Sequence, residues 1–446
     1  MTDPRQRLPA VNALLDEAER SGLLAQFPRQ AVVDAIRAAL SDARQFGGTP
    51  PPSGWLDSIA FHARNWNRTT LVGVVNATGV VLHTNMGRAP LADAAFEAAE
   101  QALRYSTLEL DLNTGERGSR QDNLRALLRE VTGADDGLVV NNAAAAMFLL
   151  LNTLAENAET IVSRGELVEI GGSFRIPEIL AKSGSTLREV GTTNRTRLKD
   201  YTLALSPRTG ALLKVHRSNF EILGFTEDTA LSELVNLGKA RGIPVIHDIG
   251  SGLLVDLSAY GLDGEPLVRD SVAAGAATVF SGDKLVGGPQ AGIIVGPADV
   301  IKLARSNPLA RAYRPDKFTI AALEATLGLY RYPDLAIQEI PALAMLVAPP
   351  DELARRAAVL ATMLPGTEMV PGESAVGGGS FPGRQLETTL VSYACESPKS
   401  VLEVLRHNDP PVIARVADGS VLFDVRTVRD EEFEIIANAL ATVRAR

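Results

Sequence analysis

A lysine near the end of a predicted strand carries the clearest chemical signal in the sequence. In residues 277–296, ATVFSGDKLVGGPQAGIIVG, an apolar run ends at Phe280, a tight turn carries Lys284, and a second apolar run follows a glycine-rich bend. A lysine on such a rigid support, partly desolvated, is suited to form a Schiff base with pyridoxal phosphate (PLP). A surface lysine in a hairpin turn is the competing interpretation, because one lysine in a glycine-rich turn is a weak signal.

An aspartate upstream favours the cofactor interpretation. Residues 243–254, IPVIHDIGSGLL, predict a short buried strand at Val245 and Ile246, after which Asp248 stands in a glycine-bounded turn. A buried carboxylate needs a cationic partner, and the protonated ring nitrogen of PLP is one. Alone, Asp248 would more often be a helix N-cap or a turn residue. Followed later in the chain by Lys284, it fits the order expected in a large class of PLP folds.

A strand that turns directly into a helix could hold the cofactor phosphate. Residues 138–140 predict a strand, and the turn at Asn142 and Ala143 leads at once into an alanine-rich helix. Backbone N–H groups at such a helix start are free to bind a phosphate. Without Lys284 and Asp248 this would be a routine connection, because the chain has neither G-x-x-x-x-G-K-[ST] nor G-x-G-x-x-G.

An arginine before a predicted helix is a candidate anion ligand. Residues 72–88 alternate short apolar runs with turns, and Pro90 is expected to open a helix that continues through Leu103. Arg88 would then stand just before a helix N-terminus, a place suited to anions. An isolated arginine is more often a solvated side chain, so this assignment depends on the other residues.

The elements that must position these residues alternate between strand and helix. From 160 to 300, short apolar strands alternate with helical stretches, which predicts a mostly parallel α/β sheet with the site at the strand carboxyl ends. Residues 8–46 have helical periodicity in two pieces and end at a Gly/Pro-rich break. We therefore expect three domains: a helical N-terminal domain (1–65), a catalytic domain (66–334) and a small C-terminal α+β domain (335–446).

Composition narrows the classes of function. The chain has 446 residues, 46% of them hydrophobic, and its single cysteine, Cys395, excludes an internal disulfide and a cysteine-based metal cluster. No metal is expected, and neither a signal peptide nor a membrane-spanning segment is evident, so the predicted compartment is the cytoplasm. The net charge of −9 argues against a surface that coats nucleic acid. Residues 1–72, with eight arginines, no lysine and seven acidic residues, carry +1 and could still form a local site.

Several long motifs in one order resemble a known family. They include RLPAVNALL, VVNATGVVLHTNMGRAPL, GERGSRQDN, VVNNAAAAM, SRGELVEIGGSFRIPEI, FSGDKLVGGPQAGIIVG and NPLARAYRPDKFTIAALEATL. Across nearly its whole length the chain resembles the bacterial selenocysteine synthases, the L-seryl-tRNA(Sec) selenium transferases, which are fold-type I PLP enzymes. Departures such as Asn307 and Arg217 affect loop contacts rather than the cofactor site.

The resemblance implies specific roles at the cofactor. Lys284 would carry the Schiff base, Asp248 would pair with the ring nitrogen, and Ser281 with the turn at Asn142 and Ala143 would hold the phosphate. PLP is therefore the expected cofactor, bound in the large domain of a fold-type I transferase.

The resemblance also implies a reaction and its partners. Arg88, Arg311 and Arg314 would gather the selenium-donor anion, and Asp283 would assist catalysis. Lys284 would remove the Cα proton of a seryl group on tRNA(Sec), the hydroxyl would leave, and selenium from selenophosphate would add. The family implies a homo-oligomer, dimer-based and up to a decamer, with tRNA bound by the N-terminal domain.

Two other classes of function compete with this one. A PLP-dependent lyase or transferase for a small amino acid or an amino-sugar phosphate would keep Lys284 and Asp248 but would need no tRNA. Its usual mark is the absence of an N-terminal helical domain, which this chain has. An RNA-binding or scaffold protein that has lost its chemistry should lack the Schiff-base lysine, which is present here.

Overall fold

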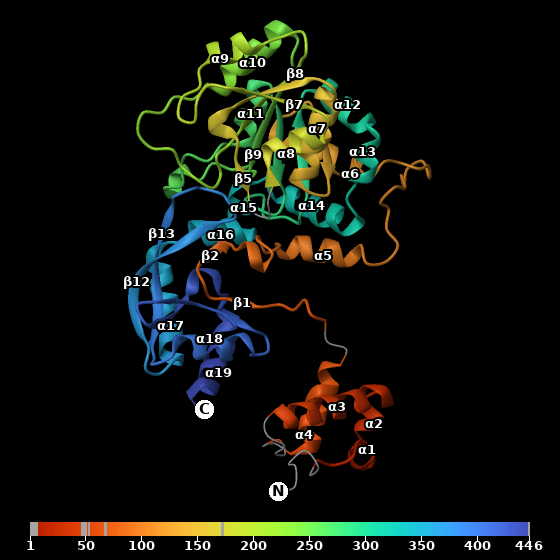
Figure 1. The fold of residues 1–446 in the computed structure, drawn as a ribbon, viewed down its shortest axis with the longest axis vertical. Helices are drawn as coiled ribbons and strands as arrows, with labels where there is room; N and C mark the ends of the chain where they lie inside the picture. Colours follow the sequence, from red (N-terminus) through yellow and green to blue (C-terminus); the bar gives the residue numbers. More distant parts are fainter. Residues whose placement is uncertain (1–7, 46–50, 52–53, 67–68, 171–173, 445–446) are drawn as a thin grey trace. The chain divides into compact units, whose positions relative to one another are not determined.

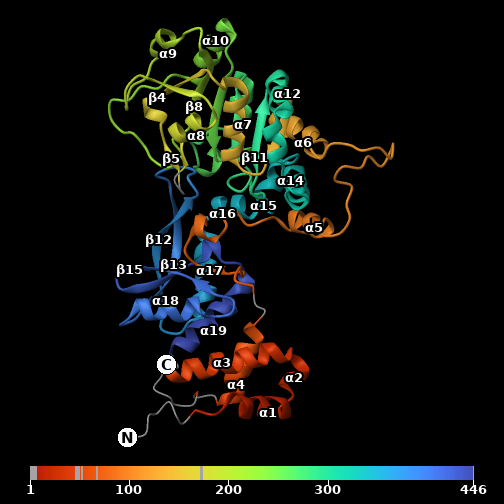
Figure 2. The same ribbon diagram turned by 45° about the vertical axis from the view of Figure 1, so that its right-hand side comes forward.

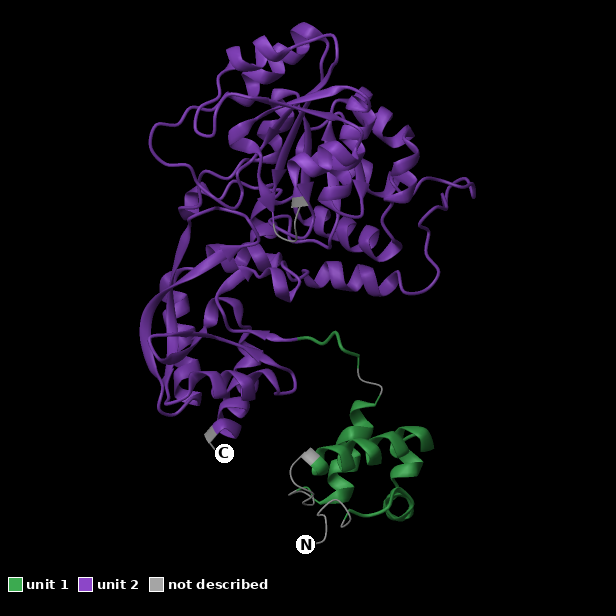
Figure 3. Ribbon diagram, in the orientation of Figure 1, with its two compact units in different colours: residues 1–73 green, residues 74–446 purple. Residues whose placement is uncertain are grey.

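The computed structural model describes residues 8–45, 51, 54–66, 69–170 and 174–444. The chain forms two compact units, residues 1–73 and 74–446 (Figure 3). The helices of the first unit are α1 (Val11–Arg20), α2 (Leu23–Gln26), α3 (Arg29–Gln45) and α4 (Trp55–Asn65). Leu14, Ile36 and Ile59 share its core, one each from α1, α3 and α4. The predicted helical N-terminal region is therefore confirmed.

A seven-stranded sheet organises the second unit. Its strands, in spatial order, are β3 (Asp136–Val140), β11 (Gly292–Gly296), β10 (Ala277–Ser281), β9 (Val245–Gly250), β8 (Thr209–Val215), β4 (Glu159–Ser163) and β7 (Thr186–Val190). Only β11 runs against its neighbours; β10, β9, β8, β4 and β7 pair in parallel. The predicted mostly parallel sheet is confirmed.

Each face of this sheet has its own core, because successive strand residues point to opposite sides. Val140 and Ile294 face one core, whereas Val139 and Ile293, their neighbours in sequence, face another. The first face is covered by α7 (Ala143–Ala155), α8 (Ile176–Lys182) and α12 (Ala298–Ser306). The second is covered by α6 (Asp122–Thr132), α11 (Val268–Ala274) and α14 (Lys317–Leu329), and towards β7 by α9 (Leu198–Ala204) and α10 (Leu231–Arg241). Figures 1 and 2 show this helix-covered sheet from two directions.

The carboxyl ends of the parallel strands bring the candidate residues to one edge. Asp248 of β9 lies opposite Val215 of β8 on one side and opposite Val279 of β10 on the other. Lys284 follows the end of β10, and α7 begins shortly after β3 ends. The sheet therefore places Asp248, Lys284 and the first turn of α7 at the edge where ligands bind in open α/β sheets.

A smaller sheet is formed mainly by the C-terminal part of the chain. Its strands, in spatial order, are β15 (Arg415–Ala417), β16 (Ser420–Asp424), β13 (Gln385–Ala394), β12 (Glu368–Gly377) and β2 (Val80–Leu82). Another strand pair joins β1 (Val75–Asn76) to β14 (Val412–Ile413). The segment that opens the second unit thus pairs with C-terminal strands, which the sequence did not indicate. The predicted domain boundary at residue 334 stays a prediction.

Helices complete this part of the structure. They are α15 (Pro333–Glu339), α16 (Pro341–Val347), α17 (Pro350–Met363), α18 (Pro398–Arg406) and α19 (Phe433–Arg444). In addition, α5 (Asp93–Gln101) packs against α14, and α13 (Pro308–Ala312) packs against the core beneath α7 and α12. A short hairpin pairs β5 (Glu169–Ile170) with β6 (Phe174–Arg175). The loop between α5 and α6 projects away from the rest of its unit in Figures 1 and 2.

Two local predictions were wrong. Pro90 does not open a helix; α5 begins at Asp93, whose acidic side chain suits a first helical turn. Asp248 does not follow its strand but lies within it, because pairing with β8 and β10 on both sides extends β9 to Gly250. The first change removes Arg88 from the start of a helix, and the second fixes Asp248 on a rigid support.

Candidate active site

Ten residues line a cavity of about 280 Å³ at the carboxyl edge of the sheet. The lining includes all five predicted cofactor residues: Lys284, Asp248, Ser281, Asn142 and Ala143. The other lining residues are Arg88, Ala144, Ile170, Gly250 and Gln290. Tertiary folding therefore gathers residues from five separate segments of the sequence into one cavity.

Lys284 lies in this cavity with only 5% of its surface exposed. Burial lowers the pKa of its amine, and the positive charge of Arg88 acts in the same direction. Asp248, Asp283 and Glu265 oppose this effect. A lowered pKa makes the neutral, nucleophilic form of the amine more accessible, as formation of a Schiff base requires.

Asp248 is almost completely buried, and burial raises the pKa of its carboxyl to about 6. Lys284 and the backbone N–H of Gly250, which donates to Oδ1 at 3.1 Å, act against that rise. A carboxylate held on a strand in this position would gain from a further cation in the cavity. The protonated ring nitrogen of PLP is such a cation, so the residue fits the predicted cofactor.

The first turn of α7 closes one side of the cavity. Asn142 caps the helix, because its Oδ1 accepts from the N–H of Ala145 at 2.8 Å. Ala143 and Ala144 line the cavity, and N–H groups in a first helical turn have no partner within the helix. A Cβ on Gly292 would come within 2.0 Å of the Asn142 carbonyl, so only glycine lets β11 pass so close. This arrangement fits a bound phosphate.

Ser281 lines the cavity, but its hydroxyl has a protein partner. It donates to Oδ1 of Asp283, and Nη1 of Arg88 binds Oδ2 of the same carboxylate at 2.8 Å. Asp283 is thus held on both oxygens, with 9% of its side chain exposed. The predicted phosphate contact of Ser281 would have to compete with this hydrogen bond.

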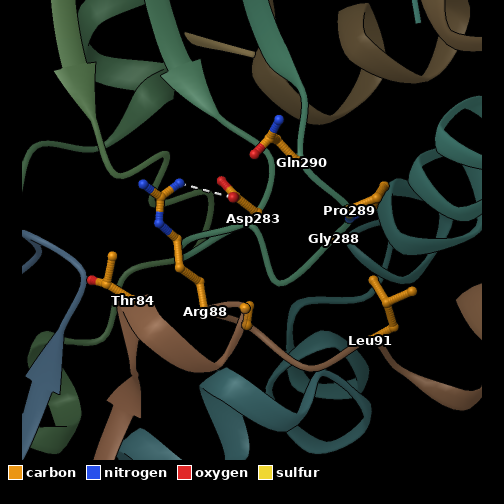
Figure 4. Close-up of a pocket in the computed structure, with 9 residues that line it drawn as sticks. Thr84, Arg88, Leu91, Asp283, Gly288, Pro289 and Gln290 are labelled. Atoms are coloured by element: carbon orange, nitrogen blue, oxygen red, sulfur yellow. Dashed lines mark hydrogen bonds and ion pairs between the residues drawn. The ribbon is translucent and has the colours of Figure 1, made fainter. Parts of the chain in front are cut away.

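Arg88 stands between the Lys284 cavity and a second cavity of about 400 Å³. Figure 4 shows the second cavity, in which the guanidinium of Arg88 points at Asp283, with Thr84 and Gln290 nearby. The backbone of Arg88 is left-handed, with φ of 64°, which is uncommon for a residue other than glycine. This strained position directs the side chain towards Asp283.

Arg311 and Arg314 line a different cavity, of about 290 Å³, together with Arg117, Arg120, Arg305 and Glu109. Hydrogen bonds from Arg120 and Arg117 lower the pKa of Glu109. Arg314 also approaches that carboxylate, with Nη1 3.6 Å from Oε1. Within one chain, therefore, Arg88 does not line the cavity that Arg311 and Arg314 share.

The comparisons with known proteins decide the family. The family model described as L-seryl-tRNA selenium transferase matches residues 74–429, and the selenocysteine synthase N-terminal model matches residues 5–44. The chain belongs to the L-seryl-tRNA selenium transferase family. It is 50% identical to the L-seryl-tRNA(Sec) selenium transferase of Solidesulfovibrio magneticus and 49% identical to that of Nitratidesulfovibrio vulgaris, with 97% of each chain covered.

A solved structure supports the fold of this L-seryl-tRNA selenium transferase family member. A D-glucosaminate-6-phosphate ammonia-lyase superposes with a TM-score of 0.60 at 20% identity, over 84% of this chain and 96% of the other. The predicted fold class, a fold-type I architecture with a mostly parallel sheet, is confirmed. Among the described residues, no helix is both long and apolar enough to cross a bilayer.

The sequence analysis missed several residues of this selenium transferase site. Gln290 and Gly250 line the cavity although neither was singled out, and Glu265 contributes charge near Lys284. Gln290 stands only six residues after Lys284 within the same motif, so it could have been proposed. Glu265 gave no such signal, because its segment has the composition of an ordinary surface loop.

Proposed function

We propose that the chain converts seryl-tRNA(Sec) to selenocysteinyl-tRNA(Sec), using PLP at Lys284 and selenophosphate as the selenium donor. The observation that carries this proposal is the single cavity that joins Lys284, Asp248 and the start of α7, in a member of the selenium transferase family. The resemblance to relatives at about 50% identity favours this reaction over a PLP enzyme for a small amino acid or an amino-sugar phosphate.

Lys284 and Asp248 have complementary tasks in this reaction. When bound, PLP supplies an electron-withdrawing ring that makes the Cα proton of the seryl group acidic. The Nζ of Lys284, whose pKa is lowered by burial, accepts that proton. Asp248, fixed on β9, would pair with the ring nitrogen, and the first turn of α7 would hold the phosphate.

Asp283 is our candidate for the acid that protonates the departing hydroxyl. Hydroxide leaves poorly, so an acid must donate to the seryl oxygen. Asp283 lies one residue before Lys284, and its carboxylate is oriented by Ser281 and Arg88. The cluster keeps the acid next to the lysine that removes the Cα proton.

Arginines would gather the selenium donor. Selenophosphate is a multiply charged anion, and guanidinium groups bind such oxygens with paired, charge-assisted hydrogen bonds. Arg88 reaches the cofactor cavity, and we assign Arg311 and Arg314 to the same anion. A dimer-based homo-oligomer, up to a decamer, remains part of the proposal, and the cytoplasm remains the predicted compartment.

The helical unit at the N-terminus would bind tRNA. Its described arginines are all exposed: Arg20, Arg29, Arg37, Arg44 and Arg64. Arginine contacts to phosphates make binding dependent on salt. Deleting residues 1–65 should leave cofactor uptake unchanged but weaken tRNA binding at least about tenfold at fixed salt, measured by filter binding. Unchanged affinity would remove tRNA binding from this unit.

A three-substrate assay tests the function directly. Purified protein is incubated with selenophosphate and either seryl-tRNA(Sec), bulk seryl-tRNA or free serine, and selenium on the product is measured. We expect conversion only with seryl-tRNA(Sec). Equal use of free serine would favour the small-substrate alternative, and equal use of bulk seryl-tRNA would contradict specificity for tRNA(Sec).

A further inference from the structure

Two buried polar atoms near the cofactor cavity lack a hydrogen-bond partner among the described residues. They are Nε2 of His216 and Oε1 of Glu265, which lie 3.6 Å apart. The Glu265 side chain is completely buried, and 19% of the His216 side chain is exposed. A buried carboxylate is costly without a charged or hydrogen-bonded partner, so the two side chains are best understood as a pair.

The position of His216 ties this pair to Asp248. His216 directly follows β8, and its backbone N–H donates to the carbonyl oxygen of Asp248 at 2.8 Å. The two side chains also interact electrostatically: His216 favours the ionised form of Asp248, as Lys284 does more strongly. Glu265 in turn interacts electrostatically with Lys284, so each member of the pair is linked to one of the two cofactor residues.

A loop from the smaller sheet fixes Glu265. The backbone N–H of Phe381 donates to Oε2 of Glu265 at 2.7 Å. The chain reaches that point through Gly377, Gly378 and Gly379, which have left-handed φ values of 78°, 62° and 69°. Residues other than glycine rarely adopt this backbone conformation. The loop that follows the glycine run, which the proposed function does not use, therefore holds one oxygen of Glu265 through Phe381 and leaves the other facing His216.

We propose that His216 and Glu265 form a positioning pair that keeps Asp248 ionised for the cofactor ring nitrogen. Glu265 holds the imidazole of His216 in place, and His216 in turn favours the ionised form of the buried Asp248 carboxylate. The inference rests on the proposed function, because it assigns Asp248 to PLP. His216 adds to the effect of Lys284, and together they offset part of the cost of removing the Asp248 carboxylate from water.

The test uses isosteric variants and a matched control. Glu265→Gln keeps the size of the side chain and an acceptor for Phe381 but removes the charge; His216→Asn removes the imidazole. Asp263→Asn makes the same change of charge two residues away, on a side chain that is 64% exposed. For each apoprotein we would measure the PLP dissociation constant, the absorption spectrum of bound PLP and the melting temperature.

Each single variant should bind PLP about tenfold more weakly and change its absorption spectrum. The double variant should be no weaker than either single one, because the pair acts as a unit. The Asp263→Asn control should match the wild type. Additive effects in the double variant, or a lower melting temperature with wild-type affinity and spectrum, would overturn the proposal and leave a purely structural pair.

Two further measurements separate the possible failures. If Glu265→Gln does not fold, Glu265→Asp, which keeps the charge, should retain more affinity than His216→Asn; the reverse order contradicts the pair. Wild-type apoprotein that fails to take up PLP at Lys284 overturns the proposed function itself. Normal uptake by the wild type and by both single variants overturns only the positioning pair.

Discussion

The cofactor cavity and the arginine cavity differ in how they hold charge. In the first, Lys284 and Asp248 are each 5% exposed; Asp248 lies within β9, and Lys284 follows the end of β10. In the second, Arg117 and Arg314 are 76% and 36% exposed and partner Glu109 from a loop and a helix end. In the first cavity, burial lowers the pKa of Lys284 and raises that of Asp248. In the second, Arg120 and Arg117 pair with the carboxylate of Glu109.

This difference separates chemistry from recognition. A buried charge whose pKa is perturbed can exchange a proton near neutral pH, which catalysis requires. An exposed guanidinium stays charged and keeps its donors available for an anion. Substitutions in the first cavity should therefore change the rate of selenium transfer and the pH dependence of stability. Substitutions in the second should change the affinity for selenophosphate.

The largest expected effect is at Lys284. Lys284→Ala should abolish covalent attachment of PLP and lower the rate of selenium transfer by at least about 10³-fold, because it removes both the attachment point and the base. Borohydride reduction followed by peptide mass spectrometry measures the attachment. Labelled cofactor found on another lysine would show that the site is elsewhere.

Asp248→Asn should lower the rate by about 100-fold, equivalent to about 3 kcal/mol, because an amide cannot hold a positive ring nitrogen. Burial raises the pKa of Asp248 to about 6 from 3.8, so the folded apoprotein binds this proton more tightly than the unfolded chain. The contribution of Asp248 to the free energy of unfolding therefore falls as pH rises from about 4 to 6.

The same variant thus has a stability signature. Asp248→Asn apoprotein should match the wild type below about pH 4 and exceed its free energy of unfolding by about 3 kcal/mol above pH 6. Chemical denaturation at pH 4 and pH 7 measures both. If the variant and the wild type differ by the same free energy of unfolding at pH 4 and at pH 7, Asp248 is not desolvated as the structure indicates.

In the arginine cavity, Arg314→Lys keeps the charge but loses the planar fork. The apparent affinity for selenophosphate should fall about tenfold, with cofactor attachment and seryl-tRNA binding unchanged. Steady-state kinetics with varied selenophosphate measures the loss. Arg355→Lys serves as the control, because Arg355 is an exposed residue of α17 that lines neither cavity. Lost seryl-tRNA binding with normal selenophosphate use would assign Arg314 to tRNA or to subunit contacts.

The smallest effect on activity is expected at Asp136, whose carboxylate accepts a hydrogen bond from Arg305, a residue that lines the arginine cavity. Although burial alone would raise its pKa, hydrogen bonds from Arg125 and Arg305 lower the pKa of Asp136 to about 2. Its contribution to stability is complete above about pH 4 and is lost as pH falls through about 2.

Asp136→Asn should therefore lower the free energy of unfolding by about 2 kcal/mol at pH 7. The difference should shrink below pH 4, while the rate of selenium transfer stays near that of the wild type. Denaturation across this pH range measures the first effect. A large loss of activity in a folded variant would place Asp136 or Arg305 in the selenium-donor site.

The sequence by itself determined the strand order along the chain, the lysine after one strand and the aspartate close to another. Those features depend on local periodicity and on motifs whose spacing a sequence displays. It also indicated a turn at Asn142 for a phosphate, because a strand followed at once by a helix is a local pattern. Even there, the limits of β9 and the start of α5 were wrong, since strand ends depend on pairing with neighbours.

Only the tertiary structure decided which of these residues share a cavity. It joined Arg88 to Asp283, 195 positions later in the chain, and placed Arg311 and Arg314 in a cavity that Arg88 does not line. It also brought Phe381 of the smaller sheet onto Glu265, and Glu265 onto His216. Such contacts arise from the crossing of strands and loops far apart in sequence, and their energies depend on burial, which no local pattern of residues specifies.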